Sequence, residues 1–199
     1  RQSEEVLACA DRAEIHWREA QAGVREQATI ISLRGMGNKL AEDYSAAITA
    51  FREAVELWRT LSLESADVVT GLTALASAEV SAGDLDAAER DYREALRIAV
   101  AVDDRESIAL RTGNLAAQAL DRKDWLGAEA LAREALLLSE DVGRKELIAS
   151  NCHRLAATLV QQGRKLEALP HARRAVEIFT ALCSPELEAA HLILAECES

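Results

Sequence analysis

The sequence contains four stretches that share one register: SAAITAFREAVEL at residues 45–57, DAAERDYREALRI at 86–98, LGAEALAREALLL at 126–138 and LEALPHARRAVEI at 166–178. In each stretch a second alanine follows the first after seven residues, as in Ala88 and Ala95, and an aromatic residue or an alanine stands between them. Seven residues make two turns of an α-helix, so these positions lie on one helical face. Side chains this small predict that each helix packs closely against another helix.

A second series of residues precedes each stretch and marks a partner helix. Twelve residues before the first alanine stand the pairs Leu75-Ala76, Leu115-Ala116 and Leu155-Ala156, with Arg34-Gly35 as a weaker first member. Turn-forming residues, such as GDLD at 83–86, separate the two series. The repeating unit is therefore a helix, a short turn and a second helix, and it returns after 40 or 41 residues. This period predicts about ten helices, near residues 4–22, 26–40, 44–62, 66–82, 85–103, 105–122, 125–142, 145–162, 166–183 and 186–197.

These residues resemble the tetratricopeptide repeat, in which leucine and a small residue mark the first helix, and alanine, an aromatic residue and alanine mark the second. Ala13, Trp17 and Ala20 repeat the second-helix spacing near the N-terminus. The resemblance implies an all-α fold: a right-handed α-solenoid of antiparallel helix hairpins, similar to the long-period arrays of bacterial signalling proteins. We expect a single array over residues 1–199, with a second helix lacking its partner at 4–22, hairpins at 26–62, 66–103, 105–142 and 145–183, and an unpaired first helix at 186–197.

The sequence departs from the family pattern in three ways. The period is about 40 residues rather than 34, which predicts longer helices and leaves HEAT repeats as an alternative, although the alanine columns favour the tetratricopeptide repeat. Gly35 and Gly37 replace the leucine and alanine of the other repeats, so we expect an irregular helix there. Pro170 falls early in a second helix, where we expect a delayed start or a mild kink.

Composition and charge exclude several classes of protein. The formal net charge of −11 and the lack of any basic cluster disfavour nucleic acids and anionic lipid surfaces as partners. No run of 18 or more apolar residues predicts a membrane span. The four cysteines stand far apart, which favours reduced thiols and a cytoplasmic location. Because the first residue is Arg1 and the repeats are cut at both ends, we expect the chain to be a piece of a longer polypeptide.

No pattern of residues predicts catalysis, a metal site or a cofactor. None of the four histidines belongs to an H-E-x-x-H motif, and no glycine-rich loop follows a strand in the way that a phosphate-binding site requires. Cys152 and His153 are adjacent, but neighbours on a helix point about 100° apart and do not easily share a proton. We therefore expect a protein that is not an enzyme, with Cys152 in the core.

The resemblance also implies where a ligand binds, because in this family the first helices line a concave groove. We expect the groove to be lined by Thr70, Thr73, Ser77, Asn114, Asp121, Ser150, His153, Arg154 and Gln161, together with Ser81, Leu110, Gly113, Ala117 and Ala157. Of these, His153 and Arg154 are the best candidates for ligand contacts, because the two could pair with a carboxylate or a peptide carbonyl. Relatives that hold the acidic C-terminus of chaperones use lysines that this groove lacks.

Three functions are compatible with the sequence. The first is a scaffold for protein–protein interaction that binds a peptide, helix or loop in its groove. The second is the C-terminal sensor array of a larger bacterial signalling ATPase or regulator, which the stretch at residues 172–196 loosely resembles. The third is self-assembly into a homo-oligomer through the terminal helices, because Leu187, Leu192 and Leu194 would lack a covering helix.

Overall fold

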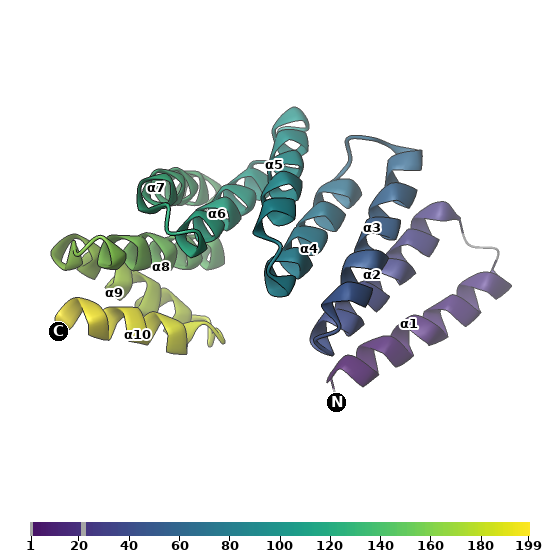
Figure 1. Ribbon diagram of the computed structural model, residues 1–199, viewed down its shortest axis with the longest axis horizontal. Coiled ribbons are helices and arrows are strands. Elements are labelled where there is room, and N and C mark those ends of the chain that lie inside the picture. The colour runs from purple at the N-terminus through teal and green to yellow at the C-terminus, as the bar shows by residue number, and fades with distance from the viewer. Residues whose placement is uncertain (1, 21–22) are drawn as a thin grey trace. The chain divides into compact units, whose positions relative to one another are not determined.

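The computed structural model describes residues 2–20 and 23–199, and over these residues it contains ten α-helices and no strand. Figure 1 shows these helices coloured from the N-terminus to the C-terminus. Their bounds are α1 Gln2–Glu19, α2 Val24–Leu40, α3 Tyr44–Leu61, α4 Ala66–Ala82, α5 Leu85–Ala101, α6 Arg105–Asp121, α7 Trp125–Val142, α8 Lys145–Gln161, α9 Lys165–Ala181 and α10 Leu187–Glu198. The all-helical fold predicted from the repeat is confirmed.

The helix ends lie within two residues of the expected positions, apart from the expected end of the first helix at residue 22, which falls outside the described residues. The irregularity expected in α2 is wrong, because α2 is continuous through Gly35 and Gly37. Both glycines are buried, and a Cβ atom at Gly35 would lie 2.8 Å from the ring of Phe51. These glycines allow neighbouring helices to approach α2 closely. Glycine would weaken α2 if this helix were isolated, but packing against its neighbours stabilises it.

The delayed start expected for α9 is also wrong, since this helix begins at Lys165, five residues before Pro170. Proline lacks the N–H that would bond the carbonyl of Leu166. Leu166 is 88% exposed, so water can take the place of the missing donor.

The helices form two compact units, divided between Asp103 and Asp104, and each is described by itself. In the first unit each helix from α1 to α4 packs on the next one in sequence, and α2 also touches α4. In the second unit each helix from α6 to α9 also packs on the next one in sequence. In addition, α8 touches both α6 and α10. Each unit is thus a stack of helix hairpins in which successive first helices are neighbours (Figure 1).

The alanine columns form the centre of both units. Every alanine of these two columns is fully buried: Ala47, Ala54, Ala88, Ala95, Ala128, Ala135, Ala168 and Ala175. Phe51 and Tyr92, between the alanines of their repeats, are 1% and 6% exposed. Cys152 is buried in the second unit, as expected. Small side chains therefore set the distance between helices, and the larger ones fill the space that remains.

The turns inside the hairpins repeat as regularly as the helices. Asp43, Asp84 and Asp124 each precede a second helix, and each carboxylate accepts a hydrogen bond of 3.0 Å from the backbone N–H three residues later. An aspartate in this position satisfies one of the free N–H groups of the first turn and opposes the helix dipole. These caps fix the residue at which each second helix begins.

Candidate functional site

On the first unit, the expected ligand-binding residues occupy one side of α4. Thr70 is exposed, while Thr73 and Ser77 are half-buried. The Thr73 hydroxyl donates a hydrogen bond of 2.7 Å to the carbonyl of Val69. The Ser77 hydroxyl accepts a hydrogen bond from Nζ of Lys39 on α2. Lys39, which was not expected from the sequence as a contact, therefore borders this side of α4, and burial lowers its pKa.

On the second unit, the expected residues lie on α6 and α8, which touch each other. The two helices approach closely at Gly113, where a Cβ atom would lie 2.3 Å from Oδ1 of Asn151 and 3.1 Å from Nη1 of Arg154. Gly113 is buried, as is Ala157 at 8% exposure, so the expectation that these two line an open groove is wrong. Their small size instead lets α8 approach α6.

Arg154 is held in place from beneath by a short hydrogen-bonded chain. Its Nη1 donates to Oδ1 of Asn151 over 3.0 Å, and Asn151 is fully buried. The amide of Asn151 donates in turn to Oγ of Ser139 over 2.7 Å and to the carbonyl of Ala135 over 3.3 Å. Two hydrogen bonds to α7 hold the amide of Asn151 in one orientation. Because Asn151 accepts a hydrogen bond from Arg154, it also holds the guanidinium of Arg154 in place.

His153, next to Arg154, is half-buried, and its Nδ1 atom is buried without a hydrogen-bond partner in the described structure. Burial lowers the pKa of His153, and the positive charge of Arg154 lowers it further, while Glu186 acts in the opposite direction. At neutral pH the imidazole is therefore uncharged and offers one N–H donor rather than a second positive charge.

The other expected residues of this unit are less constrained. Asn114 is half-buried on α6, and Asp121 and Gln161 are exposed at the C-terminal ends of their helices. Ser150 is half-buried, and its hydroxyl lies 3.5 Å from Oε2 of Glu186. All four are polar side chains that a ligand could contact without displacing the core.

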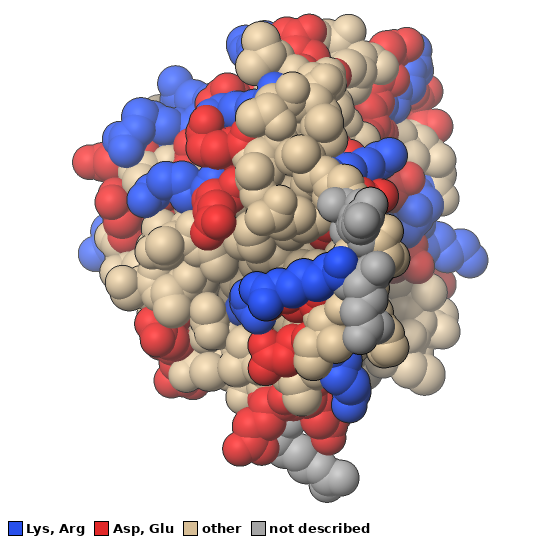
Figure 2. Space-filling model, turned by 90° about the vertical axis from the view of Figure 1, so that its right-hand side faces the viewer, with Lys and Arg blue, Asp and Glu red and all other residues tan. Residues whose placement is uncertain are grey.

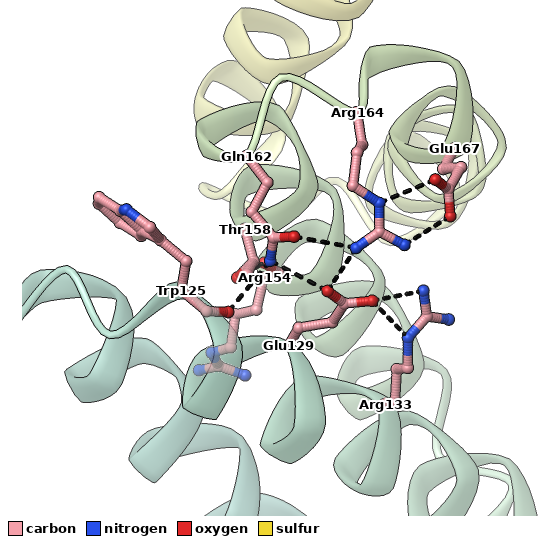
Figure 3. A network of polar contacts seen from close by, with 8 residues as sticks. All are labelled: Trp125, Glu129, Arg133, Arg154, Thr158, Gln162, Arg164 and Glu167. Atoms are coloured by element: carbon pink, nitrogen blue, oxygen red, sulfur yellow. Dashed lines mark hydrogen bonds and ion pairs between the residues drawn. The ribbon is translucent and has the colours of Figure 1, made fainter.

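A network of charged groups joins α7, α8 and α9 in the second unit (Figure 3). Glu129 accepts hydrogen bonds from Arg133, Arg164 and Gln162, at 2.5–3.0 Å. Burial alone would raise the pKa of Glu129, but these three donors outweigh it and hold the pKa at about 2. Gln162 also donates to the backbone carbonyl of Trp125, so the network fixes the turn between α8 and α9 against α7. Its groups are satisfied by one another, which indicates a structural role.

Two cavities lie in the first unit. Each is lined by two second helices of the hairpins and by the first helix that stands between them in sequence. The larger, of about 740 Å³, is lined by α1, α2 and α3 and combines Trp17, Ile30 and Ile31 with charged residues such as Arg34. Arg34 is engaged there with Asp11 and Glu14. The smaller, of about 320 Å³, is lined by α3, α4 and α5 and includes Glu79, a buried carboxylate. Neither cavity contains a residue that was expected from the sequence to contact a ligand.

The charged side chains on the surface of the described residues are mixed in sign. On the face drawn in Figure 2, lysine and arginine side chains stand among aspartate and glutamate side chains rather than in one basic field. Within the described ranges, no three His, Cys, Asp or Glu side chains are grouped so that they could hold a metal ion. No helix of the described chain is both long enough and apolar enough to cross a bilayer.

Comparison with known proteins agrees with the architecture. Two sequence models of the tetratricopeptide repeat match the chain, one over residues 26–101 and the other over residues 149–186. No curated protein gives a significant match.

Solved structures with a similar fold come from several sources. BtubC from P. vanneervenii superimposes with a TM-score of 0.79 at 22% identity, over 99% of this chain and 83% of that one. A Rap protein in complex with Competence and Sporulation Factor gives 0.78 at 12% identity, over 98% and 58%. Kinesin light chain TPR-like repeats from P. anserina give 0.72 at 17% identity, over 88% and 86%.

The chain spans little more than half of the Rap protein, so it corresponds in length to a part of that protein. The two sequence models together cover more than half of the chain, and the hairpin stack, the buried alanine columns and the solved structures agree with them. The chain belongs to the tetratricopeptide repeat family.

Proposed function

We propose that this chain is a non-catalytic scaffold that binds a peptide, helix or loop of another protein along its first helices. The proposal rests on one observation above all: Arg154 is half-buried on α8 and is held there by a buried asparagine. A guanidinium fixed in this way loses little conformational entropy when it binds an acceptor. Each unit has its own set of proposed contacts, called its first-helix face below. In the first unit the contacts are Thr70, Thr73 and Ser77, and in the second unit they are Asn114, Asp121, Ser150, His153, Arg154 and Gln161.

The chemistry of the first-helix face of the second unit favours ligand groups that accept hydrogen bonds. Arg154 supplies one positive charge, and the neutral imidazole of His153 supplies one further N–H donor. A peptide carbonyl or a single carboxylate suits this pair. A ligand with two adjacent carboxylates is less well matched, because only one of the two residues is charged.

Replacing both His153 and Arg154 by alanine tests the proposal. Peptides selected from a random display library on the intact protein should bind the double variant at least tenfold more weakly, which corresponds to about 1.4 kcal/mol. Fluorescence anisotropy of labelled peptides measures the loss. The melting temperature should also fall, because the change removes the hydrogen bond that Arg154 donates to the buried Asn151, so binding is measured well below the melting temperature of the variant.

The matched control is the double variant His171→Ala and Arg173→Ala, which removes the same residue types from the second helix α9. This variant should bind the selected peptides as the unchanged protein does. If peptide binding is weakened equally in both variants, or is not weakened in the first, the ligand does not bind at His153 and Arg154 on α8.

A second candidate function is the sensor array of a larger bacterial regulator. The fold similarity to Rap proteins favours it, since one of them is described with a bound factor and this chain matches little more than half of its length. Under this proposal the array binds a ligand or another part of its own parent chain, and any catalytic step belongs to the rest of that protein. Nucleotide hydrolysis by residues 1–199 alone would contradict the assignment as a non-catalytic module.

Self-assembly through α10 is a third candidate. Leu192 on this helix is 63% exposed, whereas Leu187, Ile193 and Leu194 pack against the core of the second unit. If α10 pairs with a second copy, light scattering should show a mass that falls on dilution, and Leu192→Lys should produce a monomer. A monomeric mass at every concentration would remove this candidate.

A further inference from the structure

The smaller cavity of the first unit is separate from the first-helix face. On α4 it is lined by Leu75 and Glu79, whereas Thr73 and Ser77 belong to the first-helix face. At 3.6 residues per turn the two pairs point roughly 180° apart. A group bound in this cavity would therefore lie on the side of the second helices α3 and α5, and it would not compete with a ligand of the first-helix face.

The carboxylate of Glu79 forms the least satisfied part of the cavity wall. The residue is 2% exposed, and Oε1 lies 3.4 Å from Nη2 of Arg52, which is long for a charge-assisted hydrogen bond. Oε2 is buried and has no hydrogen-bond donor among the described residues. A buried carboxylate oxygen without a donor is unfavourable. This wall of the cavity therefore needs either a proton or a cation.

Asp91 on α5 is the partner with which Glu79 can share a proton. Burial raises the pKa of both carboxyl groups. Repulsion by Asp91 and the hydrogen bond with it raise the pKa of Glu79 further, to about 7. The same hydrogen bond lowers the pKa of Asp91, which repulsion by Glu94 raises. Two interacting carboxyl groups of this kind titrate as a pair, with one proton held between them. Below neutral pH the pair holds one proton and carries one negative charge. Above neutral pH the pair loses this proton and carries two negative charges.

The surrounding charges leave the cavity negative when both groups are ionised. The other charged groups that line it are Arg52, Glu56 and Arg59 on α3, and Asp84, Arg90 and Glu94 at the start of or on α5. Arg59 is already engaged, because it donates to Glu56 over 2.7 Å and to Glu94 over 2.8 Å. Five carboxylates then face three guanidinium groups, an excess of two negative charges.

We propose that this cavity binds a guanidinium group between Glu79 and Asp91, supplied by an arginine side chain of a partner or by a small free molecule. A guanidinium is planar, presents donors in a fork that matches carboxylates, and is less strongly hydrated than an ammonium group. The volume of about 320 Å³ is near the lower limit of ligand pockets, which suits one side chain or a small molecule. Below neutral pH the entering cation displaces the proton of the pair into water, so the net charge of the site is unchanged. Above neutral pH the cation neutralises one of the two negative charges of the pair.

Calorimetric titration with two probes tests the site: agmatine, and the capped peptide acetyl-Gly-Arg-Gly-amide. At least one should bind at pH 8, and its affinity should fall by up to about tenfold per pH unit below the pKa of the pair, because the proton competes. Tighter binding of the peptide indicates an arginine side chain, and tighter binding of agmatine indicates a free ligand. The same peptide with citrulline in place of arginine has no charge and should not bind.

Two variants locate the binding. Glu79→Gln should abolish it at both pH 6 and pH 8, and Asp91→Asn should do the same if Glu79→Gln fails to fold. Glu89→Gln is the matched control, because Glu89 lies on the opposite side of α5 and pairs with Arg93. The proposal is wrong if neither probe binds at 20 mM, if citrulline binds as well as arginine, or if Glu79→Gln and Asp91→Asn both retain the affinity of the unchanged protein.

Discussion

Replacing Phe51 by alanine should lower the free energy of unfolding by about 3–5 kcal/mol, as large-to-small changes in a packed core do. Phe51 is 1% exposed and packs with Ala47, Leu75 and Ala78. Its ring also occupies the space above Gly35, where a Cβ atom would lie only 2.8 Å away. Urea unfolding followed by circular dichroism measures the effect, and Leu63→Ala, at a position that is 71% exposed, should change stability by less than about 0.5 kcal/mol.

The contact with Gly35 makes this prediction sharper. Gly35→Ala alone should destabilise the protein by about 1–3 kcal/mol, since its methyl group overlaps the ring of Phe51. In the Phe51→Ala background the same methyl group enters the vacated space, so it should be neutral or stabilising. The double-mutant cycle should therefore show a favourable coupling of at least about 1 kcal/mol. Additive effects of the two changes would mean that α2 and α3 do not pack through this pair.

The architecture was predictable because the residues that determine it are local and repeated. The alanine columns, such as Ala88 and Ala95, lie on one helical face whatever the rest of the chain does, and all of them are buried in the structure. Gly35 and Gly37 were interpreted wrongly for the complementary reason. Helix propensity describes an isolated helix, whereas these glycines lie against Phe51 and Leu7, which other helices supply.

The buried polar contacts of the proposed sites were less predictable. Asn151 and Ser139 stand in helical stretches where nothing in the sequence marks them as partners, yet together they fix Arg154. Glu79 was equally hidden, because a single carboxylate on an otherwise apolar stretch of α4 has no motif. The available signal was that alanine and leucine occupy the equivalent positions 119 and 159 of the next two repeats, where α4 carries a charged side chain. The role of Glu79 depends on its contact with Asp91 of the next helix, and the spacing of residues in the sequence does not predict that contact.

The proton held by Glu79 should also make stability depend on pH. In the unfolded chain this carboxyl group releases its proton near its ordinary pKa of 4.5, whereas in the folded protein the pKa is about 7. Between these two values the folded state binds more protons than the unfolded state, so the contribution of Glu79 to stability is greatest below pH 4.5 and is lost as pH rises towards 7. The difference of the two pKa values corresponds to about 3 kcal/mol.

Glu79→Gln separates this contribution from those of the other carboxyl groups. Glutamine cannot ionise, so the variant should gain stability relative to the unchanged protein as pH rises from 4.5 to 7, and the gain should level off above pH 7. Urea unfolding at half-unit steps of pH measures the difference between the two proteins at each pH. Glu89→Gln removes a carboxylate that is paired with Arg93 outside the cavity, and it should show no gain over the same range. A constant difference between Glu79→Gln and the unchanged protein from pH 4.5 to pH 8 would mean that Glu79 ionises in the folded protein as it does in the unfolded chain, and that α4 and α5 hold no shared proton between them.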